Sequence, residues 1–356
     1  MRMRLARLRQ TLADNDLDAI VISQPENRRY LSGFTGTGGV LFISPERAVL
    51  ATTFVYLEQA RKQAPAFELV RFQREFVEVW PDLVTEINAR RVAFESAHLT
   101  VAEQGKLDTG AEGAELVPTE GIVEGFRAIK DRDELDIIRK AVVLADAAFT
   151  HIVGFIEPGM TEREVAWALE VYMRTHGAEK AAFDLIVGAG PNGAMPHHEV
   201  SERVIGVGEP IVMDLGARIA GYHSDLTRTI CLGQPDGRFT EIYDVVLRAQ
   251  LAAEAAIRAG LVTGEADSAA RQVIAEAGYG EQYGHGLGHG VGLAVQEEPS
   301  IRQGAEEVLK PGMVFTVEPG IYLPDWGGVR IEDMVLVRED GVEVLSQASK
   351  EPVIIK

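Results

Sequence analysis

Residues 211–230, with the sequence IVMDLGARIAGYHSDLTRTI, constrain the fold of this chain more than any other stretch. Two runs rich in apolar residues flank a short break at residues 219–221, and this pattern predicts a β-hairpin. In such a hairpin Asp214 and Asp225 lie opposite each other, or nearly so. Directly opposed residues have Cβ atoms about 4.5–5.5 Å apart, and like charges there are destabilising.

Two carboxylates that face each other in an apolar hairpin need a cation, a proton or a hydrogen-bond donor between them. The plainer alternative is that one aspartate points to solvent or caps a turn through Ser224. The hairpin by itself leaves both interpretations open, and the rest of the chain is needed to choose between them.

The composition excludes several classes of protein. With 356 residues the chain is long enough for two domains, and its net charge of −19 argues against binding nucleic acid or an anionic membrane. The sequence contains no run of about 18 apolar residues, so no membrane span is predicted. The single cysteine, Cys231, excludes an intrachain disulfide, and the first residues lack the apolar region of a secretory signal. We therefore expect a cytoplasmic protein.

Two domains are predicted, at residues 1–125 and 126–356. Helical and strand patterns alternate in the first, which indicates an α/β domain, and residues 109–121 are rich in Gly, Glu and Thr, as in a linker. The second has helices in two blocks around strands, which indicates an α+β domain. Within it, Thr161 and Glu164 form the pattern of a capping box at a helix start.

Further candidate ligands lie among apolar residues and glycines. Each has a modest explanation alone: His285 and His289 as loop residues, and Glu318 and Glu332 as polar strand positions. However, MVFTVEPGIYL is almost entirely apolar apart from Thr316 and Glu318, and a lone buried charge is costly unless it is paired or bound to metal. Carboxylates and imidazole without thiolate suit Mn, Co, Zn or Fe(II).

The motifs of the second half resemble those of the pita-bread metallopeptidases, which include methionine aminopeptidase, aminopeptidase P and prolidase. The resemblance is carried by MDLGARIAGYHSDLTRT, GHGLGHGVGL, TVEPGIY and VRIEDMV, in that order. SQPENRRYLSGFTG in the first half resembles the N-terminal domain of aminopeptidase P, prolidase and creatinase, which methionine aminopeptidases lack. The resemblance implies an α+β fold in which a smaller α/β creatinase-like domain precedes a pita-bread catalytic domain.

This resemblance implies a role for each candidate. Two divalent metal ions (Mn, Co or Zn) would be bound by five side chains: Asp214, Asp225, His289, Glu318 and Glu332. Glu318 would also take a proton from the attacking water. His197, with its neighbour His198 as the competing assignment, and His285 would hydrogen-bond the substrate or its oxyanion, and Arg330 would orient a carboxylate or lie near the substrate.

The sequence departs from this family at one position. A second catalytic histidine usually follows the metal-binding histidine by seven residues, and here that position is Gln296. An amide donates a hydrogen bond but does not transfer a proton near neutral pH. Either a hydrogen bond suffices in this subfamily, which we favour, or the chain has become a catalytically impaired binding homologue.

The expected function is hydrolysis of the peptide bond before proline, with short proline-containing peptides as substrates. Xaa-Pro dipeptides, the substrates of prolidase, are favoured, and Arg302 and Arg330 are candidates for binding the proline carboxylate. The alternative is an aminopeptidase P that acts on longer Xaa-Pro-Xaa peptides. By analogy with these relatives we also expect a homodimer.

Overall fold

The computed structural model describes residues 2–110 and 113–355. The chain divides into two compact units, Met1–Arg127 and Ala128–Lys356. In the described part of the chain, no helix has the length and apolar character needed to cross a membrane.

In the described part of the first unit, the strands form one six-stranded sheet with the order β4-β3-β2-β1-β5-β6. Its strands are β1 (Ala19–Ile22), β2 (Val40–Ile43), β3 (Ala48–Thr52), β4 (Glu68–Arg71), β5 (Arg91–Glu95) and β6 (Glu115–Thr119). Its helices are α1 (Arg2–Asp14), α2 (Pro25–Ser32), η1 (Phe54–Tyr56), α3 (Leu57–Gln63), η2 (Phe76–Glu78), α4 (Trp80–Glu86), α5 (Val101–Gly110) and α6 (Glu124–Arg127).

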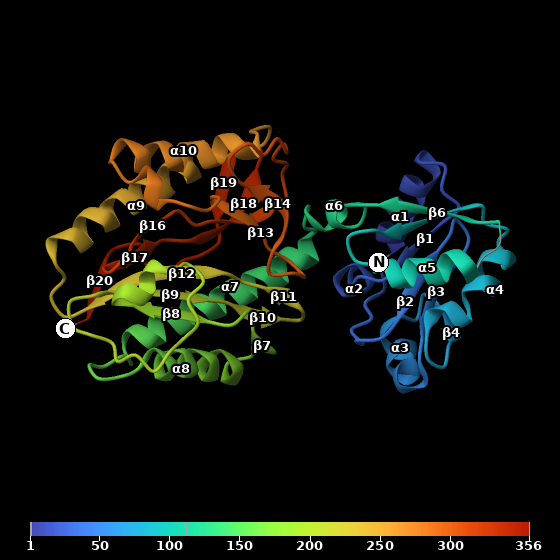
Figure 1. The fold of residues 1–356 in the computed structure, drawn as a ribbon, viewed down its shortest axis with the longest axis horizontal. Helices are drawn as coiled ribbons and strands as arrows, with labels where there is room; N and C mark the ends of the chain where they lie inside the picture. The colour runs from blue at the N-terminus through green and yellow to red at the C-terminus, as the bar shows by residue number, and fades with distance from the viewer. Residues whose placement is uncertain (1, 111–112, 356) are drawn as a thin grey trace. The chain divides into compact units, whose positions relative to one another are not determined.

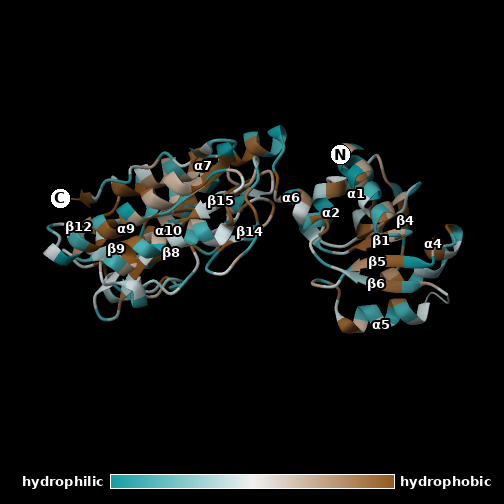
Figure 2. Ribbon diagram, turned by 90° about the horizontal axis from the view of Figure 1, so that it is seen from above, coloured by the Kyte–Doolittle hydropathy of each residue, from teal (hydrophilic) through white to brown (hydrophobic). Residues whose placement is uncertain are grey.

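Helices cover both faces of this sheet. Figure 2 shows α1 and α2 on one side of β1, β5 and β6, and α5 on the other. Strands β1, β5 and β6 are parallel, whereas β1–β2 and β2–β3 are antiparallel. The linker predicted at residues 109–121 is wrong, because residues 115–119 form β6 and pair with β5. The strand was not predicted because Leu116 and Val117 are the only two successive apolar residues in that segment before a proline.

Among its described residues, the second unit contains four small sheets and four helices of 14 or more residues. Its helices are α7 (Arg132–Val153), α8 (Glu162–Thr175), η3 (Gly190–Ala194), α9 (Gly237–Ala256), α10 (Thr263–Glu276) and η4 (Gly280–Gln282). Its strands are β7 (Lys180–Ala181), β8 (Ile186–Ala189), β9 (Pro210–Leu215), β10 (Ala217–Ile219), β11 (Tyr222–His223), β12 (Leu226–Leu232), β13 (Gly288–Gly290), β14 (Glu297–Ile301), β15 (Val314–Val317), β16 (Gly320–Leu323), β17 (Gly327–Arg330), β18 (Asp333–Arg338), β19 (Gly341–Val344) and β20 (Val353–Ile355).

The sheets of this unit lie between two pairs of helices. Figure 1 shows α9 and α10 above the strands and α8 below them, and α7 packs with α8 against the same apolar cluster. The four-stranded sheet, β20-β12-β9-β8, shares a buried apolar cluster with α7 and α8. The five-stranded sheet, β14-β13-β15-β18-β19, shares another with α9 and α10. The predicted capping box begins α8: Thr161 Oγ1 accepts from Glu164 N, and Thr161 N donates to the Glu164 carboxylate.

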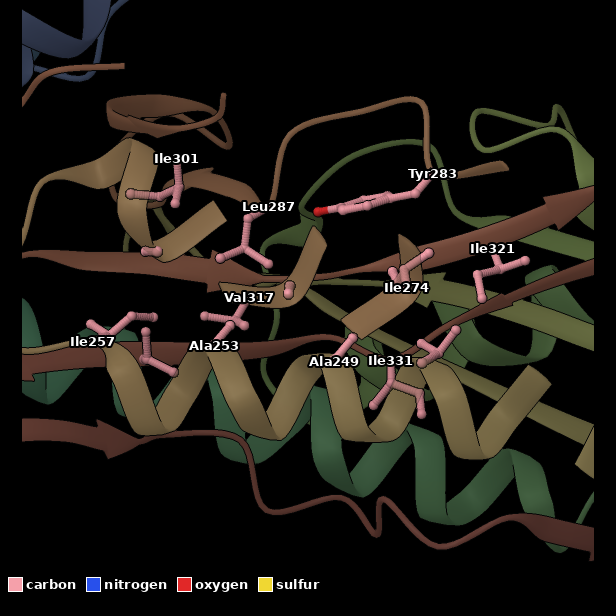
Figure 3. Packing of buried hydrophobic residues seen from close by; sticks show 14 of the residues in the cluster. Ala249, Ala253, Ile257, Ile274, Tyr283, Leu287, Ile301, Val317, Ile321 and Ile331 are labelled. Carbon is pink, nitrogen blue, oxygen red and sulfur yellow. The ribbon is translucent and has the colours of Figure 1, made fainter. Parts of the chain in front are cut away.

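Packing on α9 fixes the strands that carry the candidate ligands. Ala249 and Ala253 of this helix, and Ile257 directly after its end, lie on the side of Val317 and Ile331 (Figure 3). All five side chains are nearly inaccessible to solvent. Val317 immediately precedes Glu318, and Ile331 immediately precedes Glu332. Burial of Val317 and Ile331 therefore fixes the main chain from which the side chains of Glu318 and Glu332 project.

The predicted hairpin at residues 211–230 is present, and its two aspartates lie nearly, but not directly, opposite each other. Strands β9 and β12 continue as β10 and β11 in one register, so Asp214 pairs with Thr227. Asp225 lies two residues from Thr227, and side chains two residues apart on a strand share a face. The two aspartates are therefore diagonal neighbours on one face of the hairpin.

Candidate metal centre

Three carboxylates from separate strands meet in the second unit. Asp214 lies in β9, Asp225 immediately before β12 and Glu332 immediately before β18. Each offers one oxygen, and these oxygens all lie within 4.8 Å of one another. Asp225 is 5% exposed and Glu332 is 1% exposed, so water does not separate their charges.

His289 and Glu318 extend this cluster. His289 Nε2 lies 3.7 Å from Asp225 Oδ2 and 3.4 Å from Glu318 Oε1. The other ring nitrogen, Nδ1, faces the Gly290 carbonyl at 3.1 Å. A carbonyl only accepts, so we assign the proton of a neutral His289 ring to Nδ1. The Nε2 lone pair then faces two carboxylates, an arrangement that a cation between them stabilises.

Neighbouring side chains hold one oxygen of each of three carboxylates. Arg330 Nη2 donates to Asp214 Oδ2 at 2.7 Å. Arg330 Nε donates to the Thr227 hydroxyl at 3.0 Å, so that hydroxyl must donate its own hydrogen to Glu332 Oε2, at 2.6 Å. In the same way Thr316 accepts from a backbone N–H and donates to Glu318 Oε1 at 2.8 Å.

The charges of the cluster are not balanced by the protein alone. Burial raises the pKa of Asp225 well above its usual value, and the nearby Glu332 and Asp214 raise it further. Burial also raises the pKa of Glu332 well above its usual value, with Glu318 and Asp214 adding to the effect. Asp214 Oδ1 is buried and has no hydrogen-bond partner among the described residues. Divalent cations fit this donor set, since they supply both the missing charge and the missing partner.

The cluster opens into a cavity of about 1270 Å³ in the same unit. His197, Gln296 and Arg302 are exposed and line it. His198 also lines the cavity, but it is buried and its Nε2 lies 2.8 Å from the carboxylate of Glu162. Of the two neighbouring histidines, His197 is therefore the one whose ring is available to a bound molecule.

A chain of hydrogen bonds joins Arg330 to His285. Arg330 Nη1 donates to the Tyr322 hydroxyl at 3.0 Å, and that oxygen lies 2.9 Å from His285 Nε2. His285 Nδ1 faces the Gly286 carbonyl at 2.7 Å, so it carries a proton. Burial lowers the pKa of His285, which favours the neutral ring. Nε2 is then an acceptor, and Tyr322 donates to it.

Three residues of the site have no role in the sequence-based predictions: Thr227, Thr316 and Tyr322. A signal for the first two is present in the sequence, because each lies two residues from a predicted ligand, Asp225 or Glu318, on a strand pattern. Side chains two apart on a strand share a face. For Tyr322 we find no comparable signal, since its contact depends on how β16 pairs with β17.

Comparison with known proteins defines the class to which this fold and site belong. Residues 136–339 match the family described as "Metallopeptidase family M24", and residues 4–129 match the family described as "Creatinase/Prolidase N-terminal domain". The chain belongs to this family of metallopeptidases, and it is therefore a hydrolase that uses divalent metal ions. The predicted family and the α+β fold with a creatinase-like N-terminal domain are confirmed.

Individual relatives are similar over nearly the whole chain. The Xaa-Pro dipeptidase of Pyrococcus furiosus is 38% identical over 353 residues, which are 99% of each chain. The structure of an Xaa-Pro dipeptidase from Bacillus anthracis has a TM-score of 0.96 and 43% identity, covering 99% of both chains. An X-Pro aminopeptidase from Thermotoga maritima has a TM-score of 0.92 and 35% identity, again covering 99% of both.

Proposed function

We propose that this chain hydrolyses the peptide bond before proline in Xaa-Pro dipeptides, with two divalent cations held by Asp214, Asp225, His289, Glu318 and Glu332. Three observations support the proposal. Asp214, Asp225 and Glu332 each offer an oxygen within 4.8 Å of the others, and His289 Nε2 lies between Asp225 and Glu318, 3.7 Å and 3.4 Å from their oxygens. Asp214 Oδ1 is buried and lacks a partner among the described residues. The dipeptidases of P. furiosus and B. anthracis, both similar over 99% of the chain, support the substrate class.

When bound, paired cations generate a nucleophile at neutral pH and polarise the substrate carbonyl. The chain's own residues do the rest. Glu318 takes a proton from the attacking water, and its Oε1 is held for this by Thr316. His197, exposed in the cavity, donates to the substrate carbonyl or its oxyanion. Both ring nitrogens of His285 already have partners, so His285 contacts the substrate only where the substrate replaces the Tyr322 hydroxyl as the partner of Nε2.

The two candidate arginines have different roles. Arg302 is exposed in the cavity, and we assign to it the carboxylate of the substrate proline. Arg330 is 3% exposed and already bonded to Asp214 and Tyr322, so it orients these groups. We also propose Mn, Co or Zn as the metal, a cytoplasmic location and a homodimer.

A second candidate function is an aminopeptidase P acting on Xaa-Pro-Xaa peptides. The similarity to the X-Pro aminopeptidase of T. maritima favours it, as does the size of the cavity. The third, a binding homologue without catalysis, is favoured only by Gln296.

Hydrolysis by metal-depleted protein reloaded with Mn or Co separates the three. We expect cleavage of Ala-Pro, no cleavage of Ala-Ala, and two cations per chain by elemental analysis. Cleavage of Ala-Pro-Ala without Ala-Pro assigns the aminopeptidase function instead. Bound cations without hydrolysis of either peptide assign the binding homologue. Sedimentation of the same sample measures the oligomeric state.

A further inference from the structure

Glu332 is positioned by two consecutive residues of β12. On one side, Thr227 accepts from the Glu332 N–H at 3.1 Å through its carbonyl and donates to the carboxylate through its hydroxyl. The next residue, Arg228, donates from Nη1 to the main-chain carbonyl of Glu332. Successive side chains of a strand point to opposite faces, so Thr227 and Arg228 hold Glu332 from opposite sides of β12.

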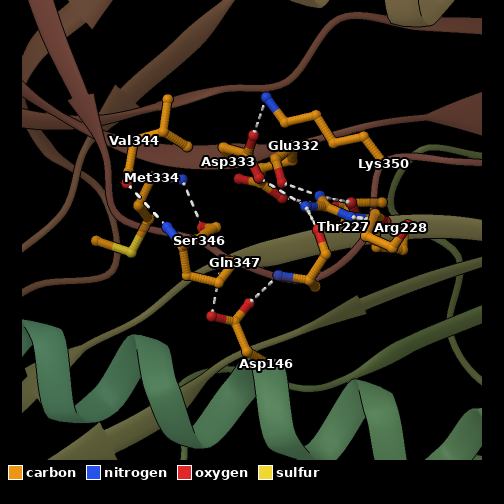
Figure 4. Close-up of polar contacts among 12 residues, drawn as sticks. Asp146, Thr227, Arg228, Glu332, Asp333, Met334, Val344, Ser346, Gln347 and Lys350 are labelled. Carbon is orange, nitrogen blue, oxygen red and sulfur yellow. Dashed lines mark hydrogen bonds and ion pairs between the residues drawn. The ribbon is translucent and has the colours of Figure 1, made fainter.

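Every nitrogen of the Arg228 guanidinium is used in this arrangement (Figure 4). Nη1 also donates to the Thr227 carbonyl at 3.0 Å, and Nη2 donates to Asp333 Oδ1 at 2.7 Å. Nε donates to the Ser349 carbonyl at 3.0 Å, and Nη2 to the Ala348 carbonyl at 2.7 Å. The residue is 1% exposed, so water does not compete for these bonds. A rigid planar fork with five bonds fixes its acceptors relative to one another.

The segment at residues 346–350 is part of the same support. Lys350 Nζ lies 2.5 Å from Asp333 Oδ2, the oxygen that Arg228 does not contact. From α7, Asp146 accepts the N–H of Gln347 at 2.9 Å and of Ala348 at 3.0 Å (Figure 4). Asp146 therefore holds the segment whose Ala348 and Ser349 carbonyls accept hydrogen bonds from Arg228.

We propose that Arg228 is a positioning residue for the metal centre: it sets the main chain at Glu332 and Asp333, and through it the direction of the Glu332 carboxylate. The inference rests on the proposed metal-dependent function. Groups that orient ligand side chains commonly change metal affinity by about 10–100-fold when they are removed. Two of the acceptors of Arg228, the Glu332 carbonyl and the Asp333 carboxylate, belong to the ligand residue and to its neighbour, so loss of these bonds would free the main chain from which the Glu332 side chain projects.

The first test is Arg228→Lys, which keeps a positive charge beside Asp333 but cannot span the same acceptors. We expect Co²⁺ to bind about 10–100-fold more weakly, with a changed visible absorption spectrum of the bound Co²⁺, while KM for Ala-Pro changes little. The matched control is Arg248→Lys on α9, where Arg248 pairs with Asp244 on the surface. It should bind Co²⁺ as the wild type does.

The second test separates positioning from stability. Removing Arg228 alone leaves the Asp333 charge buried, so Arg228→Met is combined with Asp333→Asn to remove both charges. We expect this double variant to show weakened Co²⁺ binding even where its thermal unfolding matches the wild type. Wild-type affinity and spectrum in either the Lys variant or the double variant would overturn the inference. Normal Co²⁺ binding by the wild type without hydrolysis would instead overturn the proposed function alone.

Discussion

At the scale of single residues, Asp225 is a carboxylate whose charge depends on a bound cation. It is 5% exposed, and burial together with Glu332 and Asp214 raises its pKa. Asp225→Asn removes one anion while keeping the size of the side chain. We expect the metal content to fall below two ions per chain and hydrolysis to fall by at least about 100-fold. Retention of two ions and a near-normal rate would show that Asp225 is not a metal ligand.

Gln296 is the position at which the sequence departs from the family pattern, and the structure places it in the cavity wall. Gln296→His should leave hydrolysis of Ala-Pro unchanged or raise it, by up to about 10²-fold if proton transfer there limits the rate. The pH profile of kcat should gain an ionisation that the Gln296→Ala control lacks. A collapse of activity in the His variant would mean that the amide itself makes a specific contact.

His223 makes the stability of the protein depend on acid. It is 6% exposed, its Nδ1 faces the Gly292 carbonyl at 3.0 Å, and burial lowers its pKa to about 4. The unfolded chain binds this proton near pH 6.5, well above the folded protein. The unfolded state therefore binds more protons between pH 6.5 and 4, and the free energy of unfolding falls as the pH drops through that window.

His223→Gln keeps a donor for Gly292 but does not titrate. Between pH 7 and pH 4.5 the variant should lose roughly 2–3 kcal/mol less stability than the wild type. Urea unfolding at both pH values, with chelator present so that metal release does not contribute, measures the difference. Equal losses in the two proteins would show that this histidine does not carry the acid sensitivity.

At the scale of elements, the hairpin at residues 211–230 shows what the sequence does and does not determine. Its existence and its break followed from apolar patterning and from Gly221. The diagonal placement of Asp214 and Asp225 did not, because the register depends on the turn, where Ala220 has φ 45° and Gly221 has φ 80°. A two-residue turn of this kind makes residue 216, a glycine, the partner position of Asp225.

The turn offers a test of that explanation. Positive φ at both central positions favours Asn-Gly, and alanine is strained there. Ala220→Asn should therefore raise the free energy of unfolding by roughly 1 kcal/mol without changing the rate of hydrolysis. Thermal unfolding of the metal-depleted protein measures the gain. Ala220→Val is the opposing control, because a β-branched residue disfavours this conformation; a stabilised Val variant would contradict the assigned turn.

The candidate ligands were found from the sequence because each stands out against apolar neighbours, as Glu318 does in MVFTVEPGIYL. The groups that aim them were not. These groups are Thr227, Arg228 and Tyr322. The first two contact Glu332, which lies about 100 residues further along the chain. The contacts of all three depend on how the strands pair. The sequence does indicate that Thr227 shares a strand face with Asp225, two residues away, but it does not indicate which distant residue any of the three contacts. Strand β6 was missed for a related reason. It has only two apolar residues in succession, Leu116 and Val117, and it is held as a strand by its pairing with β5.

At the scale of the whole molecule, the proposed metal ligands all belong to one compact unit, Ala128–Lys356. The first unit, Met1–Arg127, has its own apolar cluster around Trp80 and Phe42. A bound cation stabilises only the folded state that holds it. The two units should therefore respond differently to metal, although they are parts of one chain.

This difference is measurable by hydrogen exchange of the full chain with and without chelator. Mn²⁺ at about 100 times its dissociation constant should raise the free energy of opening of residues 128–356 by about 3 kcal/mol per site. Exchange in β9, β12 and β18 should slow accordingly, and exchange in β1 and β5 should not change. In Asp225→Asn the effect should shrink, because that variant binds less metal. If β1 and β5 slow as much as β12, the metal does not act through the unit that carries its ligands.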